Sequence, residues 1–341
     1  MAVFQESLRS APARAAPLLR SIRRTSGDCV LVLFVVFLAP NSLQALDGTP
    51  AGFRNRIRNL YDAFGYGKRG TSLDWGYSAF VEFNGKTILF DSGSRADLLA
   101  QNAKALGIDL AKVDIAVLSH RHADHASGFD YLLKVNPNVT LYLPSDRGLG
   151  APEHWTFDKP PESARIPPEE MYWGGKKTSI AYKSSGRFWN ARVEWVNAAR
   201  EVAPGVFVIP TTGSMMGDFS KYPPNEKRPD LIGIPELSLA LKTSKGMVLL
   251  VGCAHSTIER IVIEAMSLLK TDVELLAGGF HLLPYSSEEI TALAQKLKAD
   301  LAVRRIAPAH CSGVQAMQIF KKVFGEGYSY AGLESEVFFG P

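Results

Sequence analysis

The chain has 341 residues, of which 46% are hydrophobic and 21% charged, a balance typical of a globular protein with one large domain or two small ones. The formal net charge of +4 is concentrated at the start: residues 1–45 hold five arginines against Glu6 and Asp28, which leaves 33 basic and 32 acidic residues in 46–341. A nearly neutral body lacks the clustered basic face of nucleic-acid-binding proteins, so we expect no nucleic-acid partner.

Residues 1–45 predict a signal peptide or another N-terminal targeting segment. Arginines precede the apolar run Cys29 to Ala39, which is short for a membrane span of ~20 residues but suits the core of a secretory signal. Residues 42–45 offer a cleavage region. A retained anchor, a start downstream of Met1 and the absence of any targeting role stay open. A signal would place the protein in the periplasm or outside the cell, with membrane contact only through this segment if it is not cleaved.

The first half of the body begins with a polar, Arg-rich stretch, 46–70, which predicts a lead-in to a domain spanning 71–341. Asn84-Gly85 is the strongest short signal for a hairpin turn, here between strands 76–83 and 86–91. A helix over 95–106, a buried strand over 113–119, a helix over 124–135 and a strand over 139–143 follow. Residues 145–190 are rich in Pro, Gly, Glu and Lys, and we interpret them as a long insertion rather than core.

The second half has the same order of elements. Strands are expected over 191–197 and 202–212, and 213–234 forms a second irregular stretch. A strand pair (237–243 and 246–251), a helix 257–270 capped by Ser256, a strand 273–277, a helix 288–301, a strand 305–308 and a helix 314–323 complete the chain. Ser286 or Ser287 caps the helix at 288, with Glu289 placed for a capping box. Hairpins followed by strand–helix units predict an α/β (α+β) fold of mixed sheets sandwiched between helices, not a doubly wound parallel sheet.

The residues with chemical potential fall at strand ends. Asp91, His120, Cys253, His281 and His310 all lie at or just after the C-terminal end of a predicted strand. Loops at the ends of strands are where a rigid scaffold presents functional side chains. We therefore expect these residues to converge.

The strongest motif is the run His120-Arg-His122-Ala-Asp124-His125. Three histidines and one aspartate at these fixed positions arise by chance in roughly one chain in ten thousand. In a loop after a strand, residues two apart can point the same way, so His120 and His122 can chelate one metal while Asp124 and His125 turn toward a second. Imidazole and carboxylate suit zinc, iron or manganese. A surface histidine cluster at a helix N-terminus is the alternative, disfavoured by the buried strand that leads into the run.

This run, preceded by Leu89-Phe-Asp91-Ser-Gly, resembles the metallo-β-lactamase superfamily over about residues 70–315. The resemblance implies a four-layer αββα sandwich with metals at one edge. It implies that Asp91 supports the histidine loop by hydrogen bonds and that His310 is the last histidine ligand. An ordinary turn residue at 91 and a capping or buried histidine at 310 are the plainer interpretations.

The chain departs from most members where they carry a further histidine and a metal-bridging aspartate. Val251-Gly-Cys253-Ala-His255 stands there instead, with Cys253 in the aspartate's place and His255 able to supply the missing ligand. Gly279-Phe-His281 and His310-Cys311-x-Gly complete a likeness to the branch that holds dihydropterin–ribofuranosylaminobenzene 5'-phosphate synthases. Cys253 could be a thiolate ligand, a small buried residue or half of a disulfide with Cys311. His281 could be a ligand, a substrate contact or structural.

The hypothesis is a dinuclear hydrolase. His120, His122 and His255 hold one divalent transition metal; Asp124, His125 and His310 hold the other. Zinc is the first choice, with iron and manganese as alternatives. A metal-bound hydroxide attacks a small ester, lactone or phosphoester-like substrate, with direct catalytic roles for Asp124 and His255. The alternatives are a pterin-joining transferase, a redox protein and a non-catalytic binding protein on the same fold. The flavodiiron redox type has a glutamate where this chain has His122. The substrate and the oligomeric state are not encoded in any motif.

Overall fold

The computed structural model describes residues 55–146, 149, 153–157, 166–176, 178–182, 188, 191–212 and 234–340. All of them belong to one compact unit, 48–341. The predicted targeting segment 1–45 and most of the irregular stretch 213–234 lie outside the described residues. Among the helices that the structure describes, none combines the length and the apolar character needed to cross a membrane.

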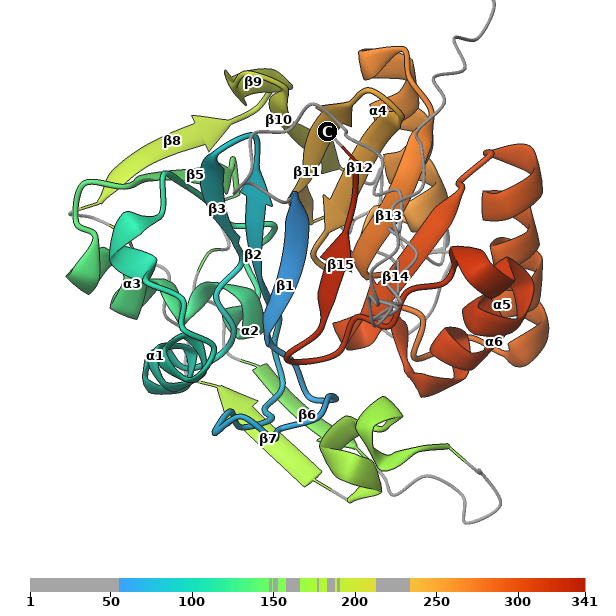
Figure 1. The fold of residues 1–341 in the computed structure, drawn as a ribbon, viewed down its shortest axis with the longest axis horizontal. Helices are drawn as coiled ribbons and strands as arrows, with labels where there is room; N and C mark the ends of the chain where they lie inside the picture. The colour runs from blue at the N-terminus through green and yellow to red at the C-terminus, as the bar shows by residue number, and fades with distance from the viewer. Residues whose placement is uncertain are drawn as a thin grey trace, which may run out of the picture. The chain divides into compact units, whose positions relative to one another are not determined.

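Two mixed β-sheets form the centre of this unit (Figure 1). The first sheet has the order β15-β1-β2-β3-β4-β5-β8 and the second the order β14-β13-β12-β11-β10-β9. Each sheet is antiparallel at one end and parallel at the other, from β3 to β8 in the first sheet and from β12 to β14 in the second. The strands of the first sheet are β1 (Arg56–Tyr61), β2 (Ser78–Phe83), β3 (Lys86–Phe90), β4 (Ile115–Val117), β5 (Thr140–Pro144), β8 (Arg192–Val196) and β15 (Glu336–Phe338); those of the second are β9 (Arg200–Ala203), β10 (Val206–Thr212), β11 (Pro235–Thr243), β12 (Gly246–Val251), β13 (Val273–Gly279) and β14 (Arg305–Ala309).

Helices lie on the outer sides of the sheets. Figure 1 shows α1 and α3 beside the first sheet and α5 and α6 beside the second. The predicted capping box is present: the Ser286 hydroxyl accepts from the Glu289 N–H, and the Glu289 carboxylate accepts from the Ser286 N–H. The cap of α4 is Thr257, not Ser256 as expected. The helices are α1 (Ala96–Ala105), α2 (Ala123–Ala126), α3 (Phe129–Val135), α4 (Ile258–Leu269), α5 (Ser287–Gln295) and α6 (Val314–Phe324).

Alternation along the strands divides the apolar side chains into three core layers. In β3, Ile88 and Phe90 join the cluster shared by the two sheets, whereas Leu89 faces the layer under α1 and α3. In β12, Leu250 faces the other sheet and Leu249 packs toward α4, α5 and α6. Three apolar layers separate four layers of secondary structure, which confirms the predicted αββα sandwich.

The predicted lead-in is wrong for its second half. Strand β1 lies inside the first sheet, between β15 and β2. Its composition is polar because Arg56 and Arg58 alternate with buried Ile57, and cross-strand carboxylates neutralise both: Arg56 contacts Glu82, and Arg58 lies 3.1 Å from Glu336. Arginines that pair across strands look like a surface linker when only composition is considered.

Residues 145–191 connect β5 to β8, which are parallel neighbours in the first sheet. This insertion holds the antiparallel pair β6 (Glu153–Phe157) and β7 (Thr178–Tyr182), and the side chains of His154 and Trp155 lie outside the described residues. The insertion contributes to the core, contrary to the interpretation from the sequence, because Tyr172 is buried among residues of the central core.

Candidate metal centre

The histidine run leaves the parallel part of the first sheet and turns at once into a helix. Strand β4 is fully buried and ends at Val117, and His122 is the N-cap of the short helix α2. The side chain of His122 points into the same space as His120, with 2.9 Å between His120 Nε2 and His122 Nδ1. Asp124 and His125 belong to the first turn of α2, and both are buried.

Asp91 fixes this loop from the end of the neighbouring strand β3. Its backbone is left-handed (φ 57°), and its carboxylate is fully buried. Oδ1 accepts from the Ser119 N–H (2.6 Å), and Oδ2 accepts from the Ser119 hydroxyl (2.7 Å) and from His125 Nδ1 (2.7 Å). Asp91 thus occupies the supporting place that the sequence predicted.

The same contacts determine which nitrogens of two histidines carry hydrogen. An ionised carboxylate only accepts, so both His125 Nδ1 and the Ser119 hydroxyl must donate to Asp91. Ser119 has then used its one hydrogen, and His120 Nδ1, at 2.8 Å, must donate to Ser119 Oγ. A neutral imidazole carries hydrogen on one nitrogen only. Nε2 of both His120 and His125 is therefore a lone-pair donor facing the centre.

Six predicted ligands form two sets. Donor atoms of His120, His122 and His255 lie within 4.8 Å of one another, and so do donor atoms of Asp124, His125 and His310. The Nε2 atoms of His125 and His310 are 3.1 Å apart, and Asp124 Oδ2 lies 3.3 Å from His310 Nε2. Ligands around a tetrahedral cation with bonds of about 2.0–2.1 Å lie roughly 3.3–3.5 Å apart, so these two distances place the second set close to a coordinating arrangement.

One buried polar atom of the second set fits a cation. Asp124 Oδ1 is buried without a hydrogen-bond partner among the described residues. A buried polar atom that lacks a partner costs free energy and needs an explanation, such as a bound ion. The donor set, five imidazoles around one carboxylate, has the chemistry of a transition-metal site.

Electrostatics keep three of the histidines and the aspartate in their binding forms. Burial, followed by repulsion from neighbouring histidines, lowers the pKa of His120 and of His255 well below the usual value. Burial also lowers the pKa of His122, to about 3. Burial alone would raise the pKa of Asp124, but His125 and His310 outweigh it, so this pKa lies below its usual range. Neutral imidazoles and an ionised carboxylate are the forms that bind metals. For His310, burial lowers the pKa, but Cys311 and Asp124 outweigh it and raise the pKa to about 9, so this imidazole must lose a proton before it binds a metal.

The second sheet contributes His255 through the turn after β12. Buried Glu236, on the neighbouring strand β11, accepts from the N–H of His255 (3.1 Å) and of Ser256 (2.5 Å). Burial raises the pKa of Glu236 to about 7. Sequence reasoning missed this residue, because one glutamate in a strand gives no local signal.

The less certain residues lie at the same edge. Cys253 Sγ is 3.2 Å from His125 Nε2 and 3.2 Å from Cys311 Sγ, and both cysteines are free thiols, so the third alternative for Cys253, a disulfide with Cys311, is absent. The His281 ring centroid lies 4.4 Å from that of His255. His281 and Cys253 also form a possible ligand group with His255. All nine predicted site residues thus converge, Asp91 as support and the other eight as possible ligands.

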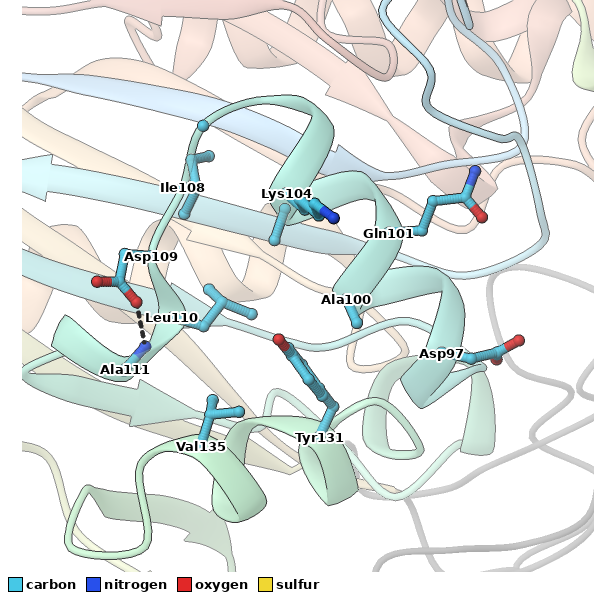
Figure 2. A pocket seen from close by; sticks show the side chains of 12 residues that line it. Asp97, Ala100, Gln101, Lys104, Ile108, Asp109, Leu110, Ala111, Tyr131 and Val135 are labelled. Atoms are coloured by element: carbon cyan, nitrogen blue, oxygen red, sulfur yellow. Dashed lines mark hydrogen bonds between the residues drawn. The ribbon is translucent and has the colours of Figure 1, made fainter.

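A cavity of about 780 Å³ lies elsewhere, between α1, α3 and the 3-10 turn Leu110–Lys112 (Figure 2). Tyr131 and Lys104 line it, and Asp109 caps the turn by accepting from the Ala111 N–H at 3.1 Å. None of the predicted site residues lines this cavity. We assign it no role.

Fold and ligand geometry together define a class. Residues 76–226 match the family model of the metallo-beta-lactamase superfamily, so the chain carries a domain of this superfamily. The match includes the histidine run, whereas His255, His281 and His310 lie beyond it. Proteins with this fold generally bind divalent metals, in agreement with the ligand groups found here.

Two curated proteins and one solved structure are similar to this chain over most of its length. Over 271 residues, 73% of this chain and 83% of the relative, the chain is 29% identical to 7,8-dihydropterin-6-methyl-4-(beta-D-ribofuranosyl)-aminobenzene-5'-phosphate synthase of Methanocaldococcus jannaschii. It is 24% identical to an uncharacterized protein of the same organism, over 75% of this chain and 91% of that one. The crystal structure of Tm1679, a metal-dependent hydrolase of the beta-lactamase superfamily, aligns with a TM-score of 0.60 at 24% identity, covering 84% of this chain and all of the other. That structure supports the fold.

Proposed function

We propose that this protein is a metal-dependent hydrolase that binds two divalent transition metal ions, zinc foremost, and cleaves a small ester, lactone or phosphoester. The observation that carries the proposal is the pair of three-donor sets at one sheet edge, His120/His122/His255 and Asp124/His125/His310. Ions bound there would supply Lewis acidity and lower the pKa of a coordinated water.

The protein's own residues prepare this chemistry. Asp91 orients one histidine of each set, directly for His125 and through Ser119 for His120. Asp124 brings negative charge among the imidazoles, which offsets part of the charge of two cations. His255, with half-buried His281 beside it, stands at the less buried side of the cluster, where a substrate would meet the ligands. Because these groups are positioned before any substrate arrives, little reorganisation is needed during the reaction.

A synthase-type transferase is the second candidate, supported by the 29% identity to the aminobenzene-phosphate synthase. In that case the same centre would assist departure of a phosphate-containing leaving group while two substrates join. A panel of phosphoesters, lactones and β-lactams, together with the pterin and aminobenzene phosphate pair, separates the two. Hydrolysis without the second substrate supports the hydrolase, and turnover only with both supports the transferase.

Metal analysis tests the shared premise. The purified chain, loaded with zinc and freed of excess, is expected to retain two equivalents. His122→Ala should lose about one equivalent and most of the activity, because it removes a donor from the first set. Asp109→Asn, which alters an exposed turn cap that contacts Ala111 and Lys112 and none of the predicted ligands, should keep both. A parent protein that retains no transition metal would refute the proposal.

A further inference from the structure

His310 holds an unusual backbone conformation for a predicted ligand. It is fully buried, and its φ of 48° lies in the left-handed region. A residue with a Cβ atom remains there only where surrounding contacts hold it. Such contacts are therefore part of how this ligand is presented.

Two side chains distant in the sequence hold the His310 peptide groups. On one side, the His310 N–H donates to Oδ2 of buried Asp62 (3.0 Å). On the other, the hydroxyl of Tyr172 donates to the His310 carbonyl and accepts from the Gly313 N–H at 3.0 Å. The Tyr172 hydroxyl thus bridges residues 310 and 313 of this turn. Tyr172 itself belongs to neither sheet.

Tyr172 comes from the insertion, from a segment (residues 166–176) that we call the strap. The strap is attached to the body at several points. The Trp173 N–H donates to the Ala63 carbonyl (2.6 Å), the Tyr330 hydroxyl donates to the Glu169 carbonyl (2.8 Å), and Lys321 lies 3.2 Å from Glu170. These contacts keep the strap in place around its one buried tyrosine.

The Tyr172 ring also belongs to an aromatic wall against the ligand. It meets Trp75 edge to face at 5.3 Å, and the Trp75 ring lies 4.5 Å from the His310 ring. Trp173, also from the strap, stacks on Trp75 with 6.4 Å between the ring centroids. Edge-to-face packing fixes ring positions as well as burying area. The strap therefore holds the His310 backbone directly and its imidazole through Trp75.

We propose that Tyr172 is a positioning residue for His310, so that occupancy of the Asp124/His125/His310 set depends on the insertion between β5 and β8. The inference rests on the proposed function, because it assigns His310 to that set. It gives the insertion a role in building the metal centre, in addition to any contact with substrate.

The test compares Tyr172→Phe with Tyr330→Phe. Both variants lose one tyrosine hydroxyl bonded to a backbone carbonyl, but only the first loses a bond to His310. In zinc titrations against a competing chelator, Tyr172→Phe should bind one of the two equivalents about 10–100-fold more weakly, the range found when supporting hydrogen bonds are removed. Tyr330→Phe should bind both equivalents as the parent does, because Trp173 and Glu170 still attach the strap to the body.

A second measurement separates this inference from the proposed function. In the metal-free protein, imidazole ¹⁵N resonances of His310 should shift or broaden in Tyr172→Phe and stay unchanged in Tyr330→Phe, with thermal unfolding confirming that both variants fold. Unchanged His310 resonances together with parent zinc affinity in Tyr172→Phe would overturn the positioning role. A parent that binds no metal would overturn the proposed function, and the resonances would still decide whether Tyr172 positions His310.

Discussion

Replacing Asp91 with asparagine should damage both ligand sets at once. The carboxylate accepts three hydrogen bonds, two from Ser119 and one from His125. Asparagine fits the same space but presents an NH₂ group where Oδ2 stood. That group donates to Ser119 Oγ and His125 Nδ1, which reverses the hydrogen-bond chain: His125 Nδ1 becomes the acceptor, and Ser119 turns its hydrogen to His120 Nδ1. Both histidines then carry hydrogen on Nε2, the atom that faces the metals.

The magnitude follows from the number of bonds. Three charge-assisted hydrogen bonds become neutral ones, at a loss of about 1 kcal/mol each, so the free energy of unfolding of the metal-free protein should fall by about 3 kcal/mol. Each ligand must also change tautomer before it binds. A loss of about 10–100-fold in metal affinity is usual for such a change, which corresponds to about 1.4–2.8 kcal/mol per site.

The assay combines zinc titration with imidazole ¹⁵N spectra, which distinguish the two tautomers. Asp114→Asn is the matched control. Like Asp91, Asp114 accepts a hydrogen bond from a backbone N–H, that of Thr87 in β3 at 2.9 Å, but it touches none of the predicted ligands. The control should keep the affinity and tautomers of the parent. If Asp91→Asn keeps them too, the carboxylate does not set the ligand tautomers and the reasoning fails.

Three further predictions concern stability. In Gly128→Ala the new Cβ would lie 1.8 Å from the Ser92 carbonyl oxygen, so unfolding should become easier by about 3 kcal/mol or more; Gly107→Ala, with open space but φ 68°, should cost about 1 kcal/mol, and equal costs in thermal melts would contradict the clash. Burial tends to raise the pKa of Asp114, but hydrogen bonds from Thr87 and Lys86 outweigh it and lower that pKa. Asp114→Asn should therefore lower stability by under about 1 kcal/mol for this half-exposed group. The deficit should be complete above pH of about 4 and vanish as pH falls through the lower folded-state pKa; a deficit that persists in acid melts would count against the assignment. Chelation should lower the melting temperature, because zinc at 100 times its Kd stabilises by about 2.7 kcal/mol per site, and an unchanged melt would mean that metal binding is not coupled to folding.

The parts of the site that the sequence predicted are those with local patterns. His120 and His122 are two residues apart after a buried strand, and such spacing is meaningful without knowledge of the fold. His310 could be placed by its position after a strand, because the carboxyl ends of parallel strands meet at one edge. The hairpin at Asn84-Gly85 was equally local. Each of these features depends on neighbours in the sequence.

The residues that were missed act over long sequence distances. Asp62 reaches a backbone N–H 248 residues away, and Tyr172 reaches a carbonyl 138 residues away. Neither stands in a motif, and Tyr172 lies in an insertion whose composition indicates a surface loop. Strand β1 was missed because the partners of its arginines lie in β2 and β15. Supporting residues of this kind become visible only when tertiary contacts are known.

Glu236 supports the backbone of His255, in the His120/His122/His255 set, as Tyr172 supports that of His310 in the other set. Its two carboxylate oxygens accept separate N–H groups, from His255 and Ser256. In Glu236→Gln one oxygen becomes an NH₂ group and faces a donor, so one backbone N–H loses its acceptor, at a cost of about 1–3 kcal/mol. The turn that carries His255 should loosen, and zinc bound by His120, His122 and His255 should be held more weakly.

The control is Glu288→Gln, at an exposed position in α5, which should bind zinc as the parent does. Combined with Tyr172→Phe, the variant becomes more informative, since each change is expected to weaken a different equivalent of zinc. The double variant should then lose affinity at both, with the two effects adding because the contacts removed share no partner. If Glu236→Gln and Tyr172→Phe instead weaken the same equivalent, the division of the six ligands into two separate sets is wrong, whatever the total stoichiometry.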